Sequence, residues 1–445
     1  MAINLLEAYK NRLATADTVF SKTRFGAKMD TQRKIMVAKC LENTNRFLNE
    51  GFANSVGTQK ADMGLYKKFC LTLATVALPT LIAPDLMLTY PMSSSSGNIA
   101  YAQYVYGSNK GGIAQGDVYN DPFHLGKIDS TYTSSRVVET ATAVTEDTAT
   151  VARLAWTPVY VGADAKANVK ITNEDGSEIS GLDFTIDAKT GLITFTAGVT
   201  ADKKVKVAYI YDNVVIPQND IPTLNVRMAH IGLEAKARRL AIYFSQLAAF
   251  EAKQDYGFDM EAALASQAVG ELKFEIDTEA VELLSTNATL DQRLTWSKTQ
   301  PIGVSLADHY KSFAATIGVA KSIIYKATKR FAPNYMVVGT GVIPVLEFMS
   351  DFVAAPATDV NGPYFMGTLG GLKVYAAPSI DDNEFFFGVN GNDMVTSAAV
   401  FAPYMSVVPT QLLQYADGGT SQGFSTMYDM KILNPALLIK GKITE

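Results

Sequence analysis

Cysteine, histidine and tryptophan are scarce in this chain of 445 residues, which holds 2 Cys, 3 His and 2 Trp. Cys40 and Cys70 are too few for a disulfide framework or a cysteine-rich metal site. Both lie in apolar helical patterns, which predicts buried free thiols. His124, His230 and His309 are far apart and lack a metal-ligand spacing. The sequence therefore predicts no metal, no cofactor and synthesis in a reducing cytoplasm.

Charge is also scarce, since Asp, Glu, Lys and Arg make up 19% of the chain and hydrophobic residues 48%. An average soluble domain has about 25% charged residues. Residues 1–68 hold 12 basic and 6 acidic residues, which leaves 27 of the 39 basic and 38 of the 44 acidic residues for the rest. A protein that grips DNA is normally basic over its folded body, so this acidic balance argues against dedicated nucleic-acid binding. The low charge instead favours a surface covered by other subunits.

Long hydrophobic runs are missing as well. The most apolar stretch, 69–84, is interrupted by Pro79 and Pro84, and a membrane helix needs about 20 apolar residues. We predict a buried helix that ends near Pro79. The N-terminus has no charged segment before an apolar run, so it is not a signal peptide. Because the sequence begins at Met1, we also expect that no propeptide was removed.

The sequence offers no convincing catalytic motif. Gly419-Thr-Ser-Gln-Gly423 matches the nucleophile-elbow pattern, but no histidine follows it in the chain, as that motif requires. We predict a loop there. Gly107-Ser-Asn-Lys-Gly-Gly112 lacks the Lys-Ser/Thr ending of a phosphate-binding loop. The sequence therefore predicts that the protein is not an enzyme.

The first 58 residues have the pattern of helices. Thr31 can cap a helix that Gly51 ends. Basic residues punctuate this segment, and they indicate either a solvated face or an arm that lies on an acidic neighbour or on packaged nucleic acid. They are Arg12, Lys22, Arg24, Lys28, Arg33, Lys34 and Lys39.

Two β regions follow. The run 99–106 predicts a strand with Tyr104 and Tyr106 on one face and Tyr101 on the other. Residues 139–215 predict a separate small β unit with 7 basic and 11 acidic residues. Its strands are expected at 169–172, 184–186, 192–195 and 205–211, with polar and glycine-rich turns between them. An inserted Ig-like sandwich fits this pattern.

Helices and strands alternate in the rest of the chain. Leu233, Leu240, Phe244 and Leu247 predict a long helix over 229–254 that serves as a spine. A second helix from Asp259 would place an apolar residue at every fourth position through 280, although Gly270 weakens it. Further strands are expected at 335–338, 372–376, 384–387 and 398–401, with a helix over 345–352. The C-terminal run 424–440 predicts two strands that meet at Asn434-Pro435.

Four sequence blocks carry a family resemblance. They are Leu78-Pro-Thr-Leu-Ile-Ala83 with Pro91-Met-Ser93, Leu224-Asn-Val-Arg-Met228 through Ala262, Gly367-Thr-Leu-Gly-Gly-Leu-Lys-Val-Tyr375 with Pro378, and Phe401-Ala-Pro-Tyr404 through Asn434-Pro435. In this order they resemble the major capsid proteins of tailed phages, most closely the T-even myovirus type. The family's Gly-Pro-Thr-Gly element is replaced here by Ser93 to Ser96, so the loop tip is expected to differ.

The resemblance implies an α+β protein of the Hong Kong 97 fold. Its parts would be an N-terminal arm, a P domain with a long spine helix, an extended loop, an A domain and the inserted Ig-like β domain. The boundaries would be 1–60 for the arm, 61–92, 229–295 and 424–445 for the P domain, 93–138 and 216–228 for the extended loop, 139–215 for the insertion and 296–423 for the A domain.

The resemblance also implies a function. The chain would assemble with itself into hexamers and pentamers that form an icosahedral head shell around double-stranded DNA. Arg238 and Arg239 in the spine helix and Tyr104 and Tyr106 in the loop would contribute to intersubunit contacts. A portal, decoration or scaffold proteins and nearby packaged DNA would be its partners, no membrane would be involved, and its place would be the virion capsid. The alternatives are a tail or baseplate structural protein with an Ig-like host-attachment domain, and an enzyme whose β unit binds substrate.

Overall fold

The computed structural model describes residues 2–24, 27–53, 60–110, 113–120, 132–146, 149–162, 168–212, 221–257, 260–355, 362–410, 413–416 and 418–444. It is a mixed α+β structure, as the sequence predicts, and it divides into two compact units. The first combines Met1–Ile99 with Ile231–Glu445, and the second is Ala100–His230. The second unit therefore interrupts the chain of the first.

The N-terminal residues form helices that pack into the core of the first unit. Their bounds are α1 Ala2–Ala8, α2 Lys10–Thr23, α3 Thr31–Ala53, α4 Lys60–Thr80 and α5 Ala83–Leu86. Leu13 and Phe20 of α2, Met36 of α3 and Leu71 of α4 are buried in one hydrophobic cluster. Gly51 does not end α3 as predicted, because one glycine costs a helix only about 1 kcal/mol.

The apolar helix α4 ends close to the predicted position. Pro79 stands one residue before the helix ends at Thr80. Cys70 on this helix and Cys40 on α3 are buried free thiols, as predicted. Within the described residues, no helix is both long and apolar enough to cross a membrane.

The helix predicted over 229–254 is wrong over residues 229–245 and is confirmed only at its end. This segment forms β11 Leu224–Glu234, β12 Lys236–Ser245 and the short helix α7 Gln246–Tyr256. Leu240, Ile242 and Phe244 alternate with exposed residues along β12, which is the period of a strand. β12 pairs with β21 along its whole length, so Arg238 and Arg239 lie on a strand and not on a spine helix. A helical stripe and a strand face can share the same spacing of apolar residues, and here the pairing partner decides.

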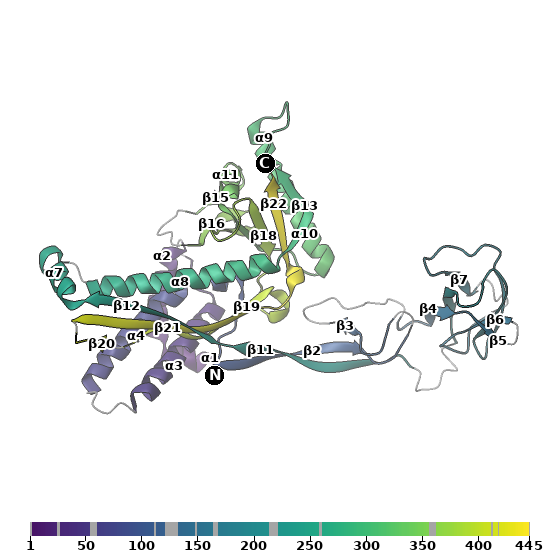
Figure 1. The fold of residues 1–445 in the computed structure, drawn as a ribbon, viewed down its shortest axis with the longest axis horizontal. Coiled ribbons are helices and arrows are strands. Elements are labelled where there is room, and N and C mark those ends of the chain that lie inside the picture. The colour runs from purple at the N-terminus through teal and green to yellow at the C-terminus, as the bar shows by residue number, and fades with distance from the viewer. Residues whose placement is uncertain are drawn as a thin grey trace. The chain divides into compact units, whose positions relative to one another are not determined.

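The long helix is α8, Met260–Asn287, which corresponds to the second predicted helix. The predicted apolar positions Ala268, Leu272, Ile276 and Ala280 are buried, and Gly270 does not interrupt the helix. Figure 1 shows α8 lying along strands β12 and β21, against which it packs.

One sheet of the first unit has the order β1-β19-β21-β12, with β20 also paired to β21. The other bounds are β1 Leu88–Thr89, β19 Ala399–Pro409, β20 Leu413–Gln414 and β21 Gly419–Ile432. The segment Gly419–Gly423 begins β21, so the predicted loop is wrong, because β12 and β20 hold it as a strand. The predicted boundary between 423 and 424 falls inside the same strand.

The other sheet of this unit has seven strands in the order β13-β22-β18-β14-β17-β16-β15. The bounds are β13 Thr289–Ser297, β14 Tyr335–Val338, β15 Phe352–Ala354, β16 Tyr364–Leu369, β17 Leu372–Ala376, β18 Glu384–Gly388 and β22 Leu438–Thr444. The accompanying helices are α9 Leu306–Lys311, α10 Phe313–Thr328, η2 Thr340–Val342, α11 Ile343–Glu347, η3 Met394–Thr396 and η4 Pro435–Leu437.

Most of the predicted elements in this region are confirmed. The expected strands correspond to β14, β17, β18 and the start of β19, and the two C-terminal strands β21 and β22 meet at Asn434-Pro435. The helix predicted over 345–352 is wrong in its extent, since α11 ends at Glu347 and Phe352 begins β15. Phe352 pairs with Leu369 at the sheet edge, and this pairing replaces the helical turn.

The second unit contains three sheets. One has the order β11-β2-β3, with β2 Ser96–Tyr106 and β3 Val118–Asn120. A three-stranded sheet has the order β4-β10-β7, with β4 Arg136–Thr142, β7 Lys170–Asn173 and β10 Lys204–Ile210. A four-stranded sheet has the order β5-β6-β9-β8, with β5 Val144–Glu146, β6 Ala149–Arg153, β8 Asp183–Asp187 and β9 Leu192–Ala197. Buried residues of these last two sheets, such as Val207 and Ile193, share one core, and the predicted strands of this region are confirmed.

Candidate functional site

The four residues predicted to make intersubunit contacts do not form one site. Arg238 on β12 donates to a Glu279 carboxylate oxygen on α8 at 2.6 Å, and its guanidinium lies 5.9 Å from the centre of the Tyr428 ring. Arg239 is the next residue on the same strand and is exposed. Arg238 thus joins a strand to the long helix inside its own chain. The intersubunit role of both arginines stays a prediction.

Tyr104 and Tyr106 lie on β2 in the second unit but differ in environment. Tyr104 is 47% exposed, whereas Tyr106 is fully buried against Tyr119 and Tyr132, with ring centres 5.4 and 4.4 Å away. Residues two positions apart on a regular strand point to the same face. Here the pairing of β2 with β3 shifts its register directly after Tyr104, so the two tyrosines differ. Contact with another subunit stays a prediction for both, and Tyr106 can affect it only through the packing of this loop.

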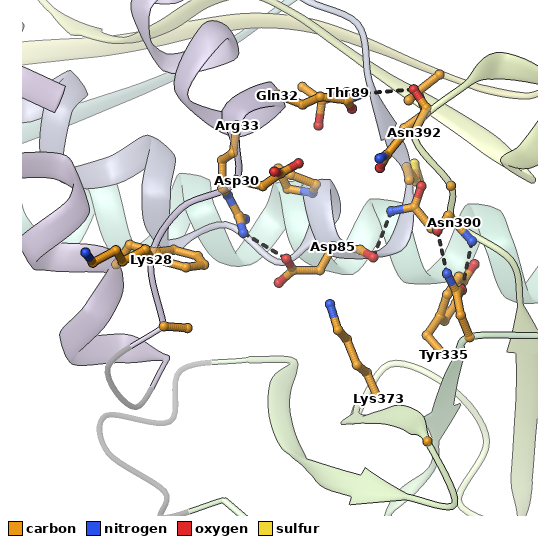
Figure 2. A pocket seen from close by; sticks show the side chains of 18 residues that line it. Lys28, Asp30, Gln32, Arg33, Asp85, Thr89, Tyr335, Lys373, Asn390 and Asn392 are labelled. Atoms are coloured by element: carbon orange, nitrogen blue, oxygen red, sulfur yellow. Dashed lines mark hydrogen bonds and ion pairs between the residues drawn. The ribbon is translucent and has the colours of Figure 1, made fainter. Parts of the chain in front are cut away.

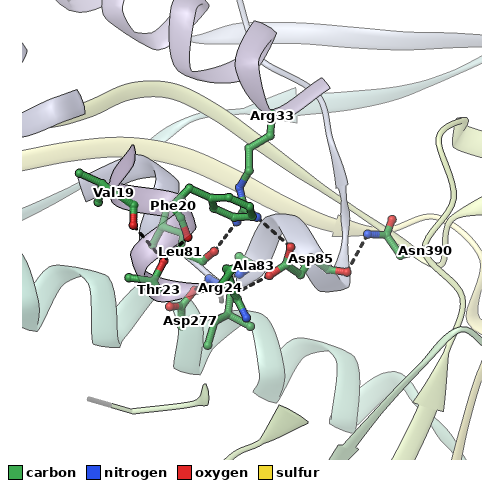
Figure 3. Close-up of polar contacts among 11 residues, drawn as sticks. Val19, Phe20, Thr23, Arg24, Arg33, Leu81, Ala83, Asp85, Asp277 and Asn390 are labelled. Atoms are coloured by element: carbon green, nitrogen blue, oxygen red, sulfur yellow. Dashed lines mark hydrogen bonds and ion pairs between the residues drawn. The ribbon is translucent and has the colours of Figure 1, made fainter. Parts of the chain in front are cut away.

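A buried charged cluster, which we call the Asp85 joint, connects distant segments of the first unit. The Asp85 carboxylate accepts from Arg24 Nη2 at 2.5 Å and from Arg33 Nη1 at 2.8 Å (Figure 3). Arg33 also donates to the Leu81 carbonyl, and Asn390 Nδ2 donates to the Asp85 carbonyl at 2.9 Å. The end of α2, helix α3 and the loop after β18 therefore meet at one residue of α5, where the two arginines bind the carboxylate and Asn390 binds the backbone carbonyl.

The Asp85 joint keeps its carboxylate charged. Burial alone would raise the pKa of Asp85, but the charges of Arg33, Arg24 and Lys373 outweigh burial and hold the pKa below its ordinary value. The sequence predicted these arginines on a solvated face or against a neighbour. A signal was present, because Asp85 is the first charge after Lys68, and a lone carboxylate at the end of an apolar run needs a buried partner.

A second buried carboxylate, Asp277 of α8, holds the turn between α4 and α5. Asp277 Oδ1 accepts from the backbone N–H groups of Ile82 and Ala83 at 2.8 and 3.0 Å (Figure 3). Burial raises the pKa of Asp277 to about 6, although these two N–H groups and Lys273 oppose the rise. Burial also lowers the pKa of Lys273. The long helix is thus fixed to the turn that carries Asp85.

A polar cavity of about 400 Å³ opens beside the Asp85 joint. Lys28, Arg33, Asp85, Lys373 and Asn390 are among the residues that line it, and Figure 2 shows Lys373 pointing toward the Asp85 carboxylate. Its walls come from the N-terminal helices and from strands of the seven-stranded sheet. The cavity therefore marks where these two parts of the first unit face each other.

The sequence predicts no metal site at the three histidines. His309 is buried and stacks on Trp296, with ring centres 4.8 Å apart, and its Nε2 lies 2.9 Å from the Ser297 carbonyl oxygen. His230 is exposed on β11, and His124 lies outside the described residues. In the part of the chain that the structure describes, no group of three or more His, Cys, Asp or Glu residues is placed to hold a metal ion.

Large apolar side chains are exposed at one end of the sheet that carries β12. Helix α7 buries none of its residues, and in Figure 1 it lies at the same end of the β12–β21 pair as β20. We call these side chains the α7 surface: Tyr243, Leu247, Phe250, Tyr256, Leu413 and Tyr415, each at least half exposed. Tyr243 and Tyr415 contact each other, with ring centres 6.1 Å apart. Exposed apolar groups in such a cluster are typical of a surface that another protein covers.

Known proteins resemble this chain in sequence over most of its length. Residues 64–444 match the family described as "Major capsid protein Gp23". The major capsid protein of Enterobacteria phage T6 is 23% identical over 390 residues, which cover 81% of this chain and 76% of that protein. The major capsid protein of Enterobacteria phage T4 is also 23% identical, with 81% and 73% covered.

A solved structure described as "Microbacterium phage Oxtober96" aligns with 82% of this chain and 90% of its own, at 12% identity and a TM-score of 0.38. Another, described as "Capsid of empty GTA particle computed with C5 symmetry", covers 81% and 89%, at 11% identity and a TM-score of 0.33.

The family match defines a structural protein of the virus head. The chain belongs to the Gp23 major capsid protein family. It is a major capsid protein of a tailed phage and forms the head shell as part of the virion. This confirms the predicted family and function over the alternative of a tail or baseplate protein.

Proposed function

We propose that the chain adopts the Hong Kong 97 fold and assembles into hexamers and pentamers that close the icosahedral shell around double-stranded DNA. The α7 surface carries this proposal, because it leaves apolar side chains in water until another subunit covers them. Arg239 and Tyr104, both exposed, are candidates for further contacts. The shell would take its portal, decoration or scaffold proteins as partners after synthesis in the host cytoplasm.

We infer a division into domains from the two sheets of the first unit. We propose a P domain made of the N-terminal helices, β12, α7, α8 and the strands β19 to β21, and an A domain made of the seven-stranded sheet with α9 to α11. Residues 93–138 and 216–228 would form the extended loop. Residues 139–215 would be an Ig-like insertion, which is supported by the core that its two sheets share.

Electron microscopy of the purified chain tests the assembly. The unchanged protein is expected to form rings or shells. Leu247→Ser and Phe250→Ser remove apolar area from two exposed side chains, so each should reduce assembly while leaving the far-ultraviolet circular dichroism unchanged. Phe250→Tyr keeps most of the area and is the matched control.

Two results would count against the proposal. Monomers of the unchanged chain under every condition tried would argue against self-assembly into capsomers. Normal assembly of both serine variants would show that the α7 surface is not a subunit contact.

A further inference from the structure

The sheet β4-β10-β7 of the second unit presents one face to solvent. Residues alternate between the core and this face along each strand, and Val137, Ile171, Val205, Val207 and Tyr209 point into the core. The register places Lys206 between Thr140 and Thr172, and Ala208 between Val138 and Lys170. We call the ten outward positions the β10 face: Arg136, Val138, Thr140, Thr142, Lys170, Thr172, Lys204, Lys206, Ala208 and Ile210.

The β10 face is basic although the region around it is acidic. Arg136, Lys170, Lys204 and Lys206 are cations, and none of the ten positions, all of them described, holds Asp or Glu. One carboxylate, Glu178, lies beside the face, where it forms a bridge with Thr172 at the sheet edge. Residues 139–215 as a whole carry 7 basic and 11 acidic residues. Cations are therefore concentrated on one surface of this sheet, whereas the region as a whole is acidic.

The cations of the β10 face have few partners of their own. Among the described residues, no hydrogen bond or ion pair joins the side chains of Arg136 and Lys204 to another group. Lys170 lies 3.7 Å from Glu178, and both side chains are largely exposed, so this pair contributes little. Lys206 donates to the Glu174 carbonyl, which leaves its charge uncompensated. The face is positioned to attract an anion.

The opposite sheet carries the opposite sign. On β8, Asp183, Thr185 and Asp187 alternate with the core residues Phe184 and Ile186. Asp187 accepts from Thr190 Oγ1 at 2.7 Å, so its charge is held at the surface. The aspartates of β8 therefore make the β10 side the more favourable one for an anionic partner, although the same sheet also carries the exposed Arg153.

The other side chains of the face indicate what kind of anion fits. Thr140, Thr142 and Thr172 supply hydroxyl groups between the cations, and Val138 and Ile210 expose 41% and 36% of their surface. Tyr160 is 54% exposed, and its N–H donates to the Ile210 carbonyl at 2.7 Å. Cations, hydroxyls and small apolar groups together match a sugar chain that bears acidic groups, since each sugar ring has both hydroxyls and an apolar face.

The geometry favours an extended polymer. Lys204 and Lys206 are about 7 Å apart along β10, and neighbouring strands lie about 4.8 Å apart. Single-stranded nucleic acids bind through a series of aromatic stacking platforms, whereas none of the ten positions is aromatic and Tyr160 beside them is a single ring. We propose that the β10 face binds a linear anionic polysaccharide that carries carboxylate or sulfate groups.

The test is a binding measurement on the full chain with defined polymers. Hyaluronate and dextran sulfate should bind, unmodified dextran should not, and raising the salt from about 50 to about 200 mM should weaken binding several-fold. Lys204→Glu removes one cation of the face and should weaken hyaluronate binding about ten-fold. Lys204→Arg keeps the charge and should bind like the unchanged protein.

Lys189→Glu is the matched control. Lys189 is exposed in the turn between β8 and β9, and this substitution changes the net charge by the same amount. It should change affinity less than about two-fold. Equal loss in both variants, or no binding of either acidic polysaccharide, would overturn the proposal. Equal or tighter binding of duplex DNA would assign the face to nucleic acid, and equal binding of poly-L-glutamate would reduce it to unspecific charge attraction. Either result would also overturn it.

Discussion

The two units bury cations in different ways. In the first, Arg24 and Arg33 share the Asp85 carboxylate, 61 and 52 residues away along the chain. In the second, Lys110 is 3% exposed, and its Nζ donates to the carbonyls of Tyr132 and Ser134 at 2.7 and 2.6 Å. The first solution relies on an opposite charge, and the second relies on oxygen dipoles and aromatic rings.

The surroundings of Lys110 show how the second solution works. Nζ lies 3.1 Å from the Tyr211 hydroxyl, and 5.4 and 4.9 Å from the ring centres of Trp156 and Tyr211. Ring faces attract a cation more strongly when water is excluded. Lys110 thereby connects the loop after β2 to the β sandwich. The comparison teaches that this weakly charged chain uses its buried charges to join segments distant in sequence.

The largest expected effect comes from Asp85→Ala. It would leave two buried guanidinium groups without their carboxylate, which costs about 3–5 kcal/mol in the free energy of unfolding. Denaturant unfolding of the unassembled chain measures it. Glu42→Ala is the control, because Glu42 is 44% exposed in its pair with Lys39 and losing this pair should cost at most about 1 kcal/mol. Equal losses in the two variants would show that the Asp85 joint is not the stronger element.

Lys110→Met should have the next largest effect. The methionine fills the aromatic site but leaves the Tyr132 and Ser134 carbonyls without this donor, at a cost of about 1–3 kcal/mol. Thermal unfolding measures the loss, and the fluorescence of Trp156, near the ammonium, should report it directly. Lys189→Met, at an exposed turn, should change neither signal. Unchanged stability of Lys110→Met would mean that packing alone holds the loop to the sandwich.

Asp277→Asn should change how stability depends on pH. The pKa of Asp277 is raised to about 6 in the folded chain, against about 3.9 in an unfolded one. The folded state therefore holds this proton more tightly, so the stabilising contribution is complete below about pH 4 and is lost as the pH rises through about 6.

The amide oxygen of the variant can still accept from Ile82 and Ala83, but it does not titrate. The difference in melting temperature between variant and unchanged protein should consequently increase in favour of the variant from about pH 4 to about pH 7. Asp85 has its pKa lowered and acts with the opposite sign, but it is present in both proteins and cancels. A difference that does not change with pH would contradict the assignment.

Arg238→Ala should have the smallest effect. Its side chain and that of Glu279 are 46% and 41% exposed, and solvent-exposed pairs contribute about 0–1 kcal/mol. Arg239→Ala provides the comparison at the next position of β12. If either variant prevents assembly without lowering the stability of the unassembled chain, the predicted intersubunit role is supported. If both assemble normally, that role is excluded.

Local patterns predicted much of the fold. The strands β14, β17, β18 and β22 are short apolar runs bounded by turn residues, and they pair where such runs are expected. The prediction for residues 229–245 was wrong because the spacing of Leu240 and Phe244 fits both a helix and a strand. Only pairing with β21, nearly 190 residues later, decides between the two. Long-range pairing of this kind leaves no mark on local spacing.

The candidate site was less predictable. The basic residues of the N-terminal segment were noticed, but their partner Asp85 depends on how α2, α3 and α5 pack. Tyr104 and Tyr106 were expected to share a face, and a register shift at one residue separates them. Family resemblance gave the function, because no catalytic or binding motif in the sequence could do so.

The burial of Cys40 makes the reactivity of its thiol a measure of how often helix α3 opens. Burial raises the pKa of its thiol to about 12, so the reactive thiolate is practically absent at neutral pH while α3 is packed. A thiol reagent should modify Cys40 only during moments when this helix separates from its neighbours, and the labelling rate then counts those openings. Cys40 should be labelled more slowly in a finished shell than in free subunits. Its labelling rate, measured separately from that of the second buried thiol Cys70, would therefore follow assembly in time.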